Sequence, residues 1–409
     1  MMKQMTSRNR LGFALILGAF SALGPFTIDM YLPSFPEIAQ QFGTKASLVQ
    51  LSLTACLIGL GVGQLIMGSL SDVYGRRKPL LISMIIYLLA SFTCAVAPNI
   101  YFLIASRFIE GFAASGGIVI ARAIVRDVYS GQELTKFFSL LMLISNIAPL
   151  LAPVAGSGII SFTTWVGVFI VLGVIGILLV LIATWQLHET LPREARVSNN
   201  TMQLLMNFQT LFRDRQFIGY ALAQGIMIGG IFAYVSGTPF IYQKIYGASP
   251  QLFAVLFGSN GISLILGSQV VGRFAHIISE RRFLLLGLLL SGLTSSTVLV
   301  VVLLHGPLFS LVIPLFFFVA SIGMTSTASF PLAMESQSHI AGSASALLGL
   351  LPFLLGSITS PLVGVAGEYS AIPMGVILIS ASFLALCAYF FLVRRPTVGV
   401  IADSHQLGL

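Results

Sequence analysis

The chain contains long stretches of consecutive apolar residues, and these stretches limit the folds that are open to it. Residues 79–97, "PLLISMIIYLLASFTCAVA", place mostly apolar side chains on every face of a helix. A helix needs about 20 such residues to cross a bilayer, whereas an outer-membrane β-barrel would alternate apolar with polar residues. Only 8% of the chain is charged, against about 25% in soluble proteins. The sequence therefore predicts an all-α integral membrane protein.

Hydropathy predicts twelve membrane spans in two groups of six. Their expected limits are residues 11–33, 47–70, 79–97, 100–123, 137–159, 164–186, 216–239, 252–273, 283–304, 308–332, 342–366 and 372–393. Residues 188–215 are polar, charged and too long for a tight turn, so they divide the chain. We expect an N-terminal six-helix bundle (1–187), a cytoplasmic linker (188–215), a C-terminal six-helix bundle (216–395) and a cytoplasmic tail (396–409).

The positions of Lys and Arg predict how the spans are oriented. With both termini in the cytoplasm, eighteen of these residues fall inside, Lys45 and Lys244 fall outside, and Arg107 lies within a span. Cytoplasmic loops carry an excess of positive charge, which explains the net charge of +8 without nucleic acid. We therefore expect a multi-pass protein of the bacterial plasma (inner) membrane, in contact with the lipid bilayer and not with nucleic acid.

The two halves of the chain resemble each other. "GSLSDVYGRRK" from Gly68, after the second span, has a counterpart in "GSQVVGRFAHIISERR" from Gly267, after the eighth. "TIDMYLPSF" similarly matches "YVSGTPFIY", with Pro33 and Pro239 in corresponding places. Internal repeats with a binding site at their interface are typical of transporters. The sequence thus predicts a transporter with two pseudo-symmetric bundles.

The loop after the second span combines glycines, which allow close helix approach and a tight turn, with an acid. Asp72 can accept hydrogen bonds from an arginine or from a helix N-terminus. With the twelve spans and the repeat, the loop resembles motif A of the major facilitator superfamily, although Val73 replaces the usual basic residue. The resemblance implies a latch between the bundles on the cytoplasmic side; a plain loop anchored to the inner leaflet is the alternative. The motif residues are Gly68, Asp72, Gly75, Arg76 and Arg77.

The fourth span carries two charges in "LIASRFIEGFAASGG". Arg107 and Glu110 are three residues apart, so they share one helix face and can meet. The stretch resembles motif B of drug–proton antiporters, in which the buried arginine is tied to proton transfer, although Glu110 stands where a glutamine is frequent. A structural ion pair is the alternative. Arg122 and Arg126 recur on the same face, and we expect an inner-leaflet anchor there rather than a cavity lining.

The fifth span contains "SNIAPLLAPVAGSG". Pro149 and Pro153 should kink this helix, while Gly156 and Gly158 should permit close packing. The segment resembles motif C, the antiporter motif, in an Ala-Pro form instead of the usual Gly-Pro form. A membrane helix that merely tolerates proline is the alternative.

Asp29 lies near the end of the otherwise apolar first span, where a carboxylate in lipid costs several kcal/mol. Its segment "TIDMYLPSFPEIAQQF", together with "ARAIVRDVYSGQE", "ETLP" and "HIAGSASALLG", resembles the bicyclomycin and chloramphenicol resistance (Bcr/CflA) branch of that superfamily. In related drug antiporters an acid in this part of helix 1 takes up the proton and helps to recognise the substrate. The resemblance implies this role for Asp29; a position at the membrane interface is the alternative. Glu37 is expected in a solvated outer loop.

Drug pockets are mostly apolar with a few polar groups, so we expect a cavity lined from both halves. Besides Asp29 and Arg107, the candidate substrate-binding residues are Tyr31, Gln224, Tyr234, Ser236, Asn260, Thr327 and Phe330. The sequence has no Gly-Lys-Ser phosphate loop and no metal-binding motif. We therefore expect no cofactor and no metal, with transport driven by the proton gradient.

These features favour a proton-coupled exporter of small amphipathic drugs that works by alternating access and is a monomer. The resemblance implies substrates such as bicyclomycin, chloramphenicol or sulfonamides. Export of a metabolite such as an amino acid, or facilitated transport by the same fold, is the alternative. An enzyme would need a catalytic cluster at membrane depth, where only Asp29, Arg107 and Glu110 are available, so we expect none.

Overall fold

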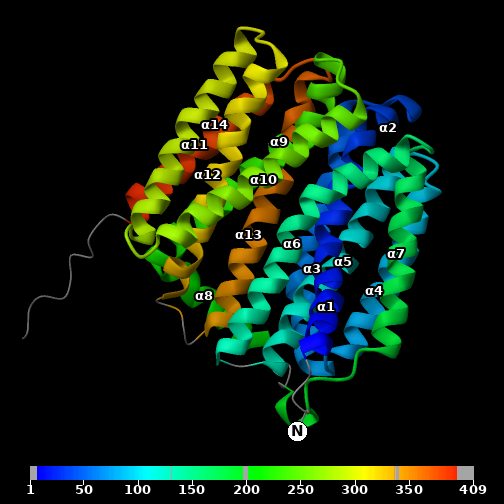
Figure 1. Cartoon of the computed structure of the whole chain (residues 1–409), viewed down its shortest axis with the longest axis vertical. Helices are drawn as coiled ribbons and strands as arrows, with labels where there is room; N and C mark the ends of the chain where they lie inside the picture. The colour runs from blue at the N-terminus through cyan, green and yellow to red at the C-terminus, as the bar shows by residue number, and fades with distance from the viewer. Residues whose placement is uncertain (1–6, 130, 197–200, 336, 338–339, 394–409) are drawn as a thin grey trace, which may run out of the picture.

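The computed structural model describes residues 7–129, 131–196, 201–335, 337 and 340–393. Within them, twelve helices are long and apolar enough to cross a membrane, which confirms the predicted number (Figure 1). These helices are α1 (Ser7–Asp29), α3 (Ala46–Tyr74), α4 (Arg77–Ala95), α5 (Ile100–Val128), α6 (Gly131–Ile160), α7 (Trp165–Trp185), α9 (Arg215–Phe240), α10 (Pro250–Phe274), α11 (Glu280–Leu303), α12 (Leu308–Glu335), α13 (Ala341–Leu362) and α14 (Ile372–Ala388). The predicted tail 396–409, and Ser130 and His339 of the family segments, lie outside the described residues.

The spanning helices form two bundles of six, with α1 and α3–α7 on one side of Figure 1 and α9–α14 on the other. Two helix pairs join the bundles: α3 packs on α13, and α6 packs on α10. In the predicted repeat, α3 corresponds to α10 and α6 to α13. The two contacts are therefore one contact repeated by pseudo-symmetry.

Glycines bring helices into backbone contact at equivalent places in both bundles. A Cβ atom on Gly59 of α3 would overlap the carbonyl of Phe108 in α5, and one on Gly111 of α5 would overlap the carbonyl of Cys56. In the second bundle, Gly267 of α10 and Gly323 of α12 make the same kind of approach. Small residues permit this spacing because membrane helices associate through close packing rather than through the hydrophobic effect.

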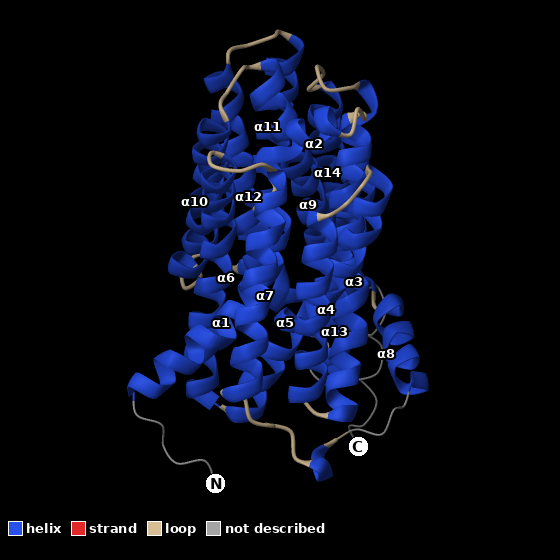
Figure 2. Cartoon of the chain, turned by 90° about the vertical axis from the view of Figure 1, so that its right-hand side faces the viewer, coloured by secondary structure: helices blue, strands red, loops and turns tan. Residues whose placement is uncertain are grey.

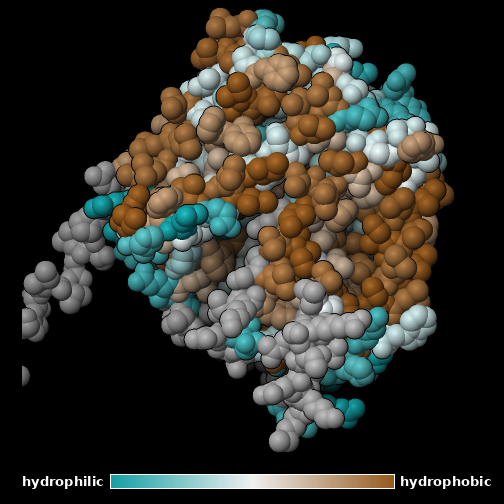
Figure 3. All heavy atoms as spheres, viewed as in Figure 1, coloured by the Kyte–Doolittle hydropathy of each residue, from teal (hydrophilic) through white to brown (hydrophobic). Residues whose placement is uncertain are grey.

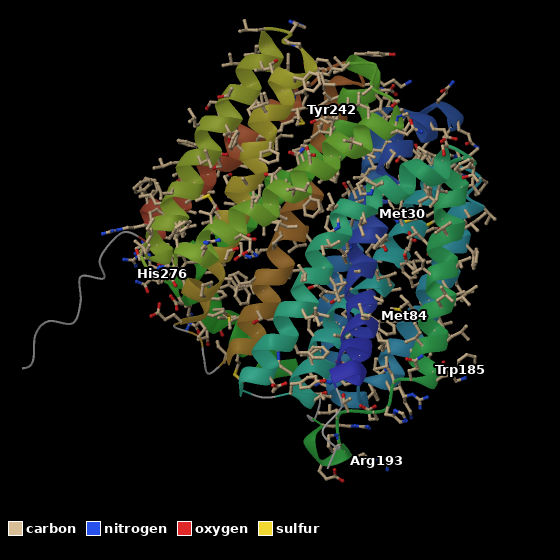
Figure 4. All side chains as sticks on the ribbon, viewed as in Figure 1. Met30, Met84, Trp185, Arg193, Tyr242 and His276 are labelled. Atoms are coloured by element: carbon tan, nitrogen blue, oxygen red, sulfur yellow. The ribbon has the colours of Figure 1, made fainter. Side chains whose placement is uncertain are left out.

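Short elements occupy the ends of the bundles. They are η1 (Leu32–Ser34), α2 (Phe35–Gln41), η2 (Arg193–Ala195), η3 (Ile241–Ile245), η5 (Val363–Ala366) and η6 (Tyr389–Val393). Arg193 and Tyr242 lie near opposite ends of the molecule (Figure 4). We call these the Gly75 end, which includes the turn between α3 and α4, and the η1 end.

The segment predicted as a linker, 188–215, contains a further helix, α8 (Thr201–Arg213). It packs against α13 and α9 (Figure 2). Leu211 is buried, whereas Phe212 is 61% exposed. The polar composition of the segment led to its prediction as a linker. The apolar residues of α8 recur with a helical period among polar ones, as in a helix that buries only one face.

The outer surface matches a lipid environment. On the face that Figure 3 shows, apolar side chains cover most of the middle, while hydrophilic ones gather mainly toward the ends and edges. A polytopic protein needs this distribution because a polar side chain that faces lipid cannot form the hydrogen bonds that water would offer it.

Candidate functional site

A cavity of about 430 Å³ lies between the two bundles. It is lined by α1, α3, α5 and α6 from the first bundle and by α9, α10, α12 and α13 from the second. The residues singled out in the sequence that line it are Asp29, Arg122, Pro149, Gln224, Tyr234 and Asn260. Most of its other walls are apolar, with side chains such as those of Ile28, Leu60, Ile118, Ile231, Phe232 and Phe257.

Asp29 is the last residue of α1 and belongs to the cavity wall. The helix ends there because the chain turns into η1, which has Pro33 near its start; proline removes a backbone donor and cannot continue the preceding helix. Asp29 is 6% exposed. Among the described residues no cation lies within 4 Å of its carboxylate, and no side chain donates a hydrogen bond to it. Asp29 is thus a carboxyl group in an apolar cavity and not an interfacial residue.

The ion pair Arg107–Glu110 lies behind the cavity wall, inside the first bundle. The Nη1 of Arg107 is 2.5 Å from Oε2 of Glu110, so the contact predicted from their spacing is confirmed. Both side chains are fully buried. Ser91 of α4 also donates to Glu110, at 2.8 Å. Neither residue lines the cavity.

Arg107 connects α5 to the last turn of α1. Its Nη2 donates to the carbonyl of Thr27 at 2.7 Å, two residues before Asp29. Its guanidinium lies 4.2 Å from the centroid of the Tyr31 ring, a cation–π contact. The pair therefore holds the end of α1, and with it the position of Asp29.

Besides Arg107, four of the expected cavity residues lie elsewhere. Tyr31 is fully buried against Arg107 inside the first bundle. Ser236 is also fully buried and donates to the carbonyl of Ser360 at 3.1 Å. On α12, Ser326 lines the cavity, but Thr327 does not, and Phe330 is 43% exposed. A shift of one residue turns a side chain by about 100° around a helix, which moves Thr327 out of the cavity wall.

The motif A turn is built around Gly75, whose φ of 90° favours glycine. The carboxylate of Glu189 accepts hydrogen bonds from the backbone N–H of Arg76 at 2.8 Å and of Arg77 at 3.3 Å, which caps α4. Partial burial disfavours the charged form, but the backbone N–H groups of Arg76, Leu191 and Arg77 outweigh it. They hold the pKa of Glu189 below its usual range.

Arg76 is 7% exposed and is held by two carboxylates, so its side chain does not face the lipid as it would in a plain anchoring loop. It pairs with Asp72 at 2.5 Å and with Asp127 of α5 at 2.8 Å. Thr190 donates to the same Asp127 at 3.0 Å. Within the described residues, all hydrogen-bond and ion-pair partners of Arg76 belong to the first bundle or to the segment following α7. Among the described residues Arg76 thus joins α3 to α5 within the first bundle, and the latch between the bundles stays a prediction.

Two residues of this network, Asp127 and Glu189, were missed as site residues. Each stands in a segment that resembles the Bcr/CflA branch, "ARAIVRDVYSGQE" and "ETLP". That resemblance was the available signal. The partner of each acid lies 51 or more residues away, at a distance that helical spacing does not predict.

The motif C segment of α6 lies at the junction of the bundles. Gly156 allows α6 to contact the carbonyl of Met30, just after Asp29 (Figure 4 labels Met30). Leu150 packs where Gly258 and Gly261 of α10 leave room for it. A Cβ atom on Gly158 would meet nothing within 4 Å, so the close packing expected at that residue is absent.

The bundles are bridged by hydrogen bonds at the η1 end. Gln50 of α3 donates to the carbonyl of Ser236 at 3.1 Å, and Gln243 donates to the carbonyl of Pro33 at 3.0 Å. Toward the Gly75 end a second cavity of about 340 Å³ shares Gln64 and Arg122 with the first. The two cavities thus adjoin at Gln64 and Arg122, and the bundles are hydrogen-bonded to each other at the η1 end.

The family model for the Major Facilitator Superfamily matches residues 15–361 of this chain. The chain belongs to the major facilitator superfamily. It is accordingly a multi-pass membrane transporter and not an enzyme. Among the described residues, no three His, Cys, Asp or Glu side chains gather in a group that would hold a metal ion.

Relatives within the superfamily cover nearly the whole chain. An uncharacterized MFS-type transporter of Bacillus subtilis, YdgK, is 52% identical over 97% of this chain and 98% of its own. A bicyclomycin resistance protein homolog of Haemophilus influenzae is 30% identical over 94% of this chain and 96% of its own. The fold is also similar to that of a bacterial homolog of the lysosomal transporter Spinster in an inward-facing conformation. That likeness has a TM-score of 0.74 at 13% identity, over 95% of this chain and 98% of that one.

Proposed function

We propose that this superfamily member exports small amphipathic, drug-like molecules in exchange for protons across the bacterial inner membrane. The observation that carries the proposal is Asp29, a carboxyl group in an apolar cavity shared by both bundles, with no cationic partner among the described residues. The similarity to a bicyclomycin resistance protein homolog supports the same substrate class. The Gly75 end is cytoplasmic in this proposal, as the positive-inside rule requires.

Coupling follows from competition at Asp29. When the cavity opens to the cytoplasm, the deprotonated carboxylate binds a substrate that donates hydrogen bonds or carries positive charge. When it opens to the outside, a proton replaces the substrate and returns with the carboxyl group. Each proton entering down about 100 mV contributes about 2.3 kcal/mol to export. Because Arg107 is paired with Glu110, it acts as a positioning residue that holds the end of α1.

The remaining elements serve the change of access. The bundles rock about the α3–α13 and α6–α10 contacts, and the protein works as a monomer with chain segments 1–187 and 216–395 as its moving parts. Motif A holds α3, α4 and α5 together at the cytoplasmic side. Export of an endogenous metabolite such as an amino acid, or facilitated transport, would use the same fold without needing proton exchange at Asp29.

The test uses inside-out membrane vesicles with a preformed pH gradient and a fluorescent pH probe. Bicyclomycin, chloramphenicol and a sulfonamide are added in turn to vesicles containing wild type, Asp29→Asn or Glu37→Gln. Glu37 is the matched control because it is a half-buried carboxylate of α2 outside the cavity. We expect drug-induced proton release from wild type and Glu37→Gln but not from Asp29→Asn. Release that survives in Asp29→Asn, with equal amounts of folded protein, would remove Asp29 from the coupling step.

A further inference from the structure

Arg122 is a cation for which the described residues supply no counter-charge. It lies on α5 and lines both the central cavity and the second cavity. No carboxylate lies within 4 Å of it, and its buried Nε has no hydrogen-bond partner. By contrast Arg76, which lines the second cavity as well, is matched by Asp72 and Asp127. Arg122 is partly buried, and a cation that is partly removed from water gains from a counter-charge. It is therefore poised to bind an anionic group that comes from outside the protein.

Other polar groups that line the cavities suit the same chemistry. Ser21 of α1 and Ser145 of α6 line the central cavity, and among the described residues their hydroxyl oxygens have no hydrogen-bond partner. Gln64 lines both cavities, as Arg122 does. Hydroxyl and amide N–H groups can donate to an anion that the guanidinium attracts.

Arg122 and Asp29 lie far apart along the cavity. Arg107 contacts the carbonyl of Thr27, two residues before Asp29, and Arg122 lies fifteen residues further along α5 than Arg107, which is about 22 Å of helix rise. A free amino acid carries its ammonium and carboxylate on one carbon atom, so it cannot engage both residues. An elongated molecule with an apolar body can place an anionic group at Arg122 while its other end extends toward Asp29.

We propose that Arg122 is a subsite for an anionic group, a carboxylate or an acidic sulfonamide nitrogen, on the transported molecule. This inference rests on the proposed function, because it assigns part of the substrate to the same cavity. It also changes the role expected for Arg122 in the sequence, where an inner-leaflet anchor was favoured. The substrate class becomes amphipathic molecules with an acidic group that enters from the Gly75 end.

Binding of a matched pair of fluorescent probes to purified protein tests the proposal. Dansylglycine carries a carboxylate, and dansylglycinamide has the same body with a neutral amide. We expect wild type to bind dansylglycine about tenfold more tightly than the amide, since hydrogen bonds to charged groups are the stronger ones. Arg122→Gln should lose this preference and Arg122→Lys should keep part of it. Arg273→Gln, at an exposed arginine of α10, should behave as wild type.

The measurement needs no proton gradient, so its outcome is independent of the vesicle experiment, and Asp29→Asn should keep the preference for dansylglycine. Failure to bind dansylglycine, equal binding of both probes to wild type, or a preference that survives in Arg122→Gln would each overturn the proposal. A repeat in nanodiscs of neutral phosphatidylcholine and of anionic phosphatidylglycerol separates two sources of the anion. If phosphatidylglycerol alone abolishes dansylglycine binding, Arg122 binds a lipid headgroup and the assignment to substrate is wrong.

Discussion

Replacing Glu110 by glutamine removes one member of a fully buried ion pair. The carboxylate accepts from Arg107 at 2.5 Å and from Ser91 at 2.8 Å. Glutamine is nearly the same size and can still accept from Ser91, but it leaves the guanidinium without a counter-charge. Removing one partner of a buried pair costs about 3–5 kcal/mol. We therefore expect Glu110→Gln to lower the free energy of unfolding by about that amount.

The assay is unfolding of the purified protein in mild detergent by titration with sodium dodecyl sulfate, read by circular dichroism. Glu335→Gln is the control because Glu335 is an exposed carboxylate at the end of α12. Surface substitutions of this kind change stability by less than about 0.5 kcal/mol. The control should therefore unfold with wild type.

A double variant, Arg107→Met with Glu110→Leu, completes the test. Apolar residues often replace a buried ion pair without loss. The double variant should then lose the hydrogen bonds from Arg107 to Thr27 and from Ser91 to Glu110, and the cation–π contact with Tyr31. We expect the free energy of unfolding of the double variant to lie within about 2 kcal/mol of the wild-type value. This loss should be well below the sum of the losses in the single variants Arg107→Met and Glu110→Leu. Losses that simply add, or a Glu110→Gln variant as stable as wild type, would refute the view that the two charges act as one structural unit.

Two further predictions concern packing and the motif A turn. Gly111→Ala should destabilise the protein by about 1–3 kcal/mol, because the new methyl group meets the backbone of Cys56. Gly158→Ala should be neutral or stabilising by up to about 1 kcal/mol, because its methyl group meets nothing. The same detergent titration compares the two variants, and equal effects would contradict the packing argument. Because the folded pKa of Glu189 is lowered, its stabilising contribution is present above the unfolded value of about 4.3 and is lost as pH falls through the folded pKa. Wild type should therefore lose more stability than Glu189→Gln between pH 5.5 and pH 3.5, and parallel acid curves would show that the cap contributes nothing.

The sequence by itself determined most of the architecture. Runs of apolar residues set the twelve spans, because a helix is one of the few structures that satisfies its own backbone in lipid. The spacing of Arg107 and Glu110 was enough to predict their contact, since residues three apart share a helix face. The repeat between Gly68 and Gly267 anticipated the pseudo-symmetry of the bundles.

Only the tertiary structure decided which side chains face the cavity. In helices that are apolar on every face, periodicity does not distinguish the lipid side from the protein side; for this reason Thr327 was expected in the cavity and Ser326 was not. Long-range partners were equally hidden, as with Arg76, whose counter-charge Asp127 comes from another helix. Arg122 has the same sequence signature as a membrane anchor. Our proposal that it binds substrate depends on its place between the two bundles, where no carboxylate of the described residues pairs with it. Local spacing fixes what one helix can do, whereas the cavity forms where eight helices meet.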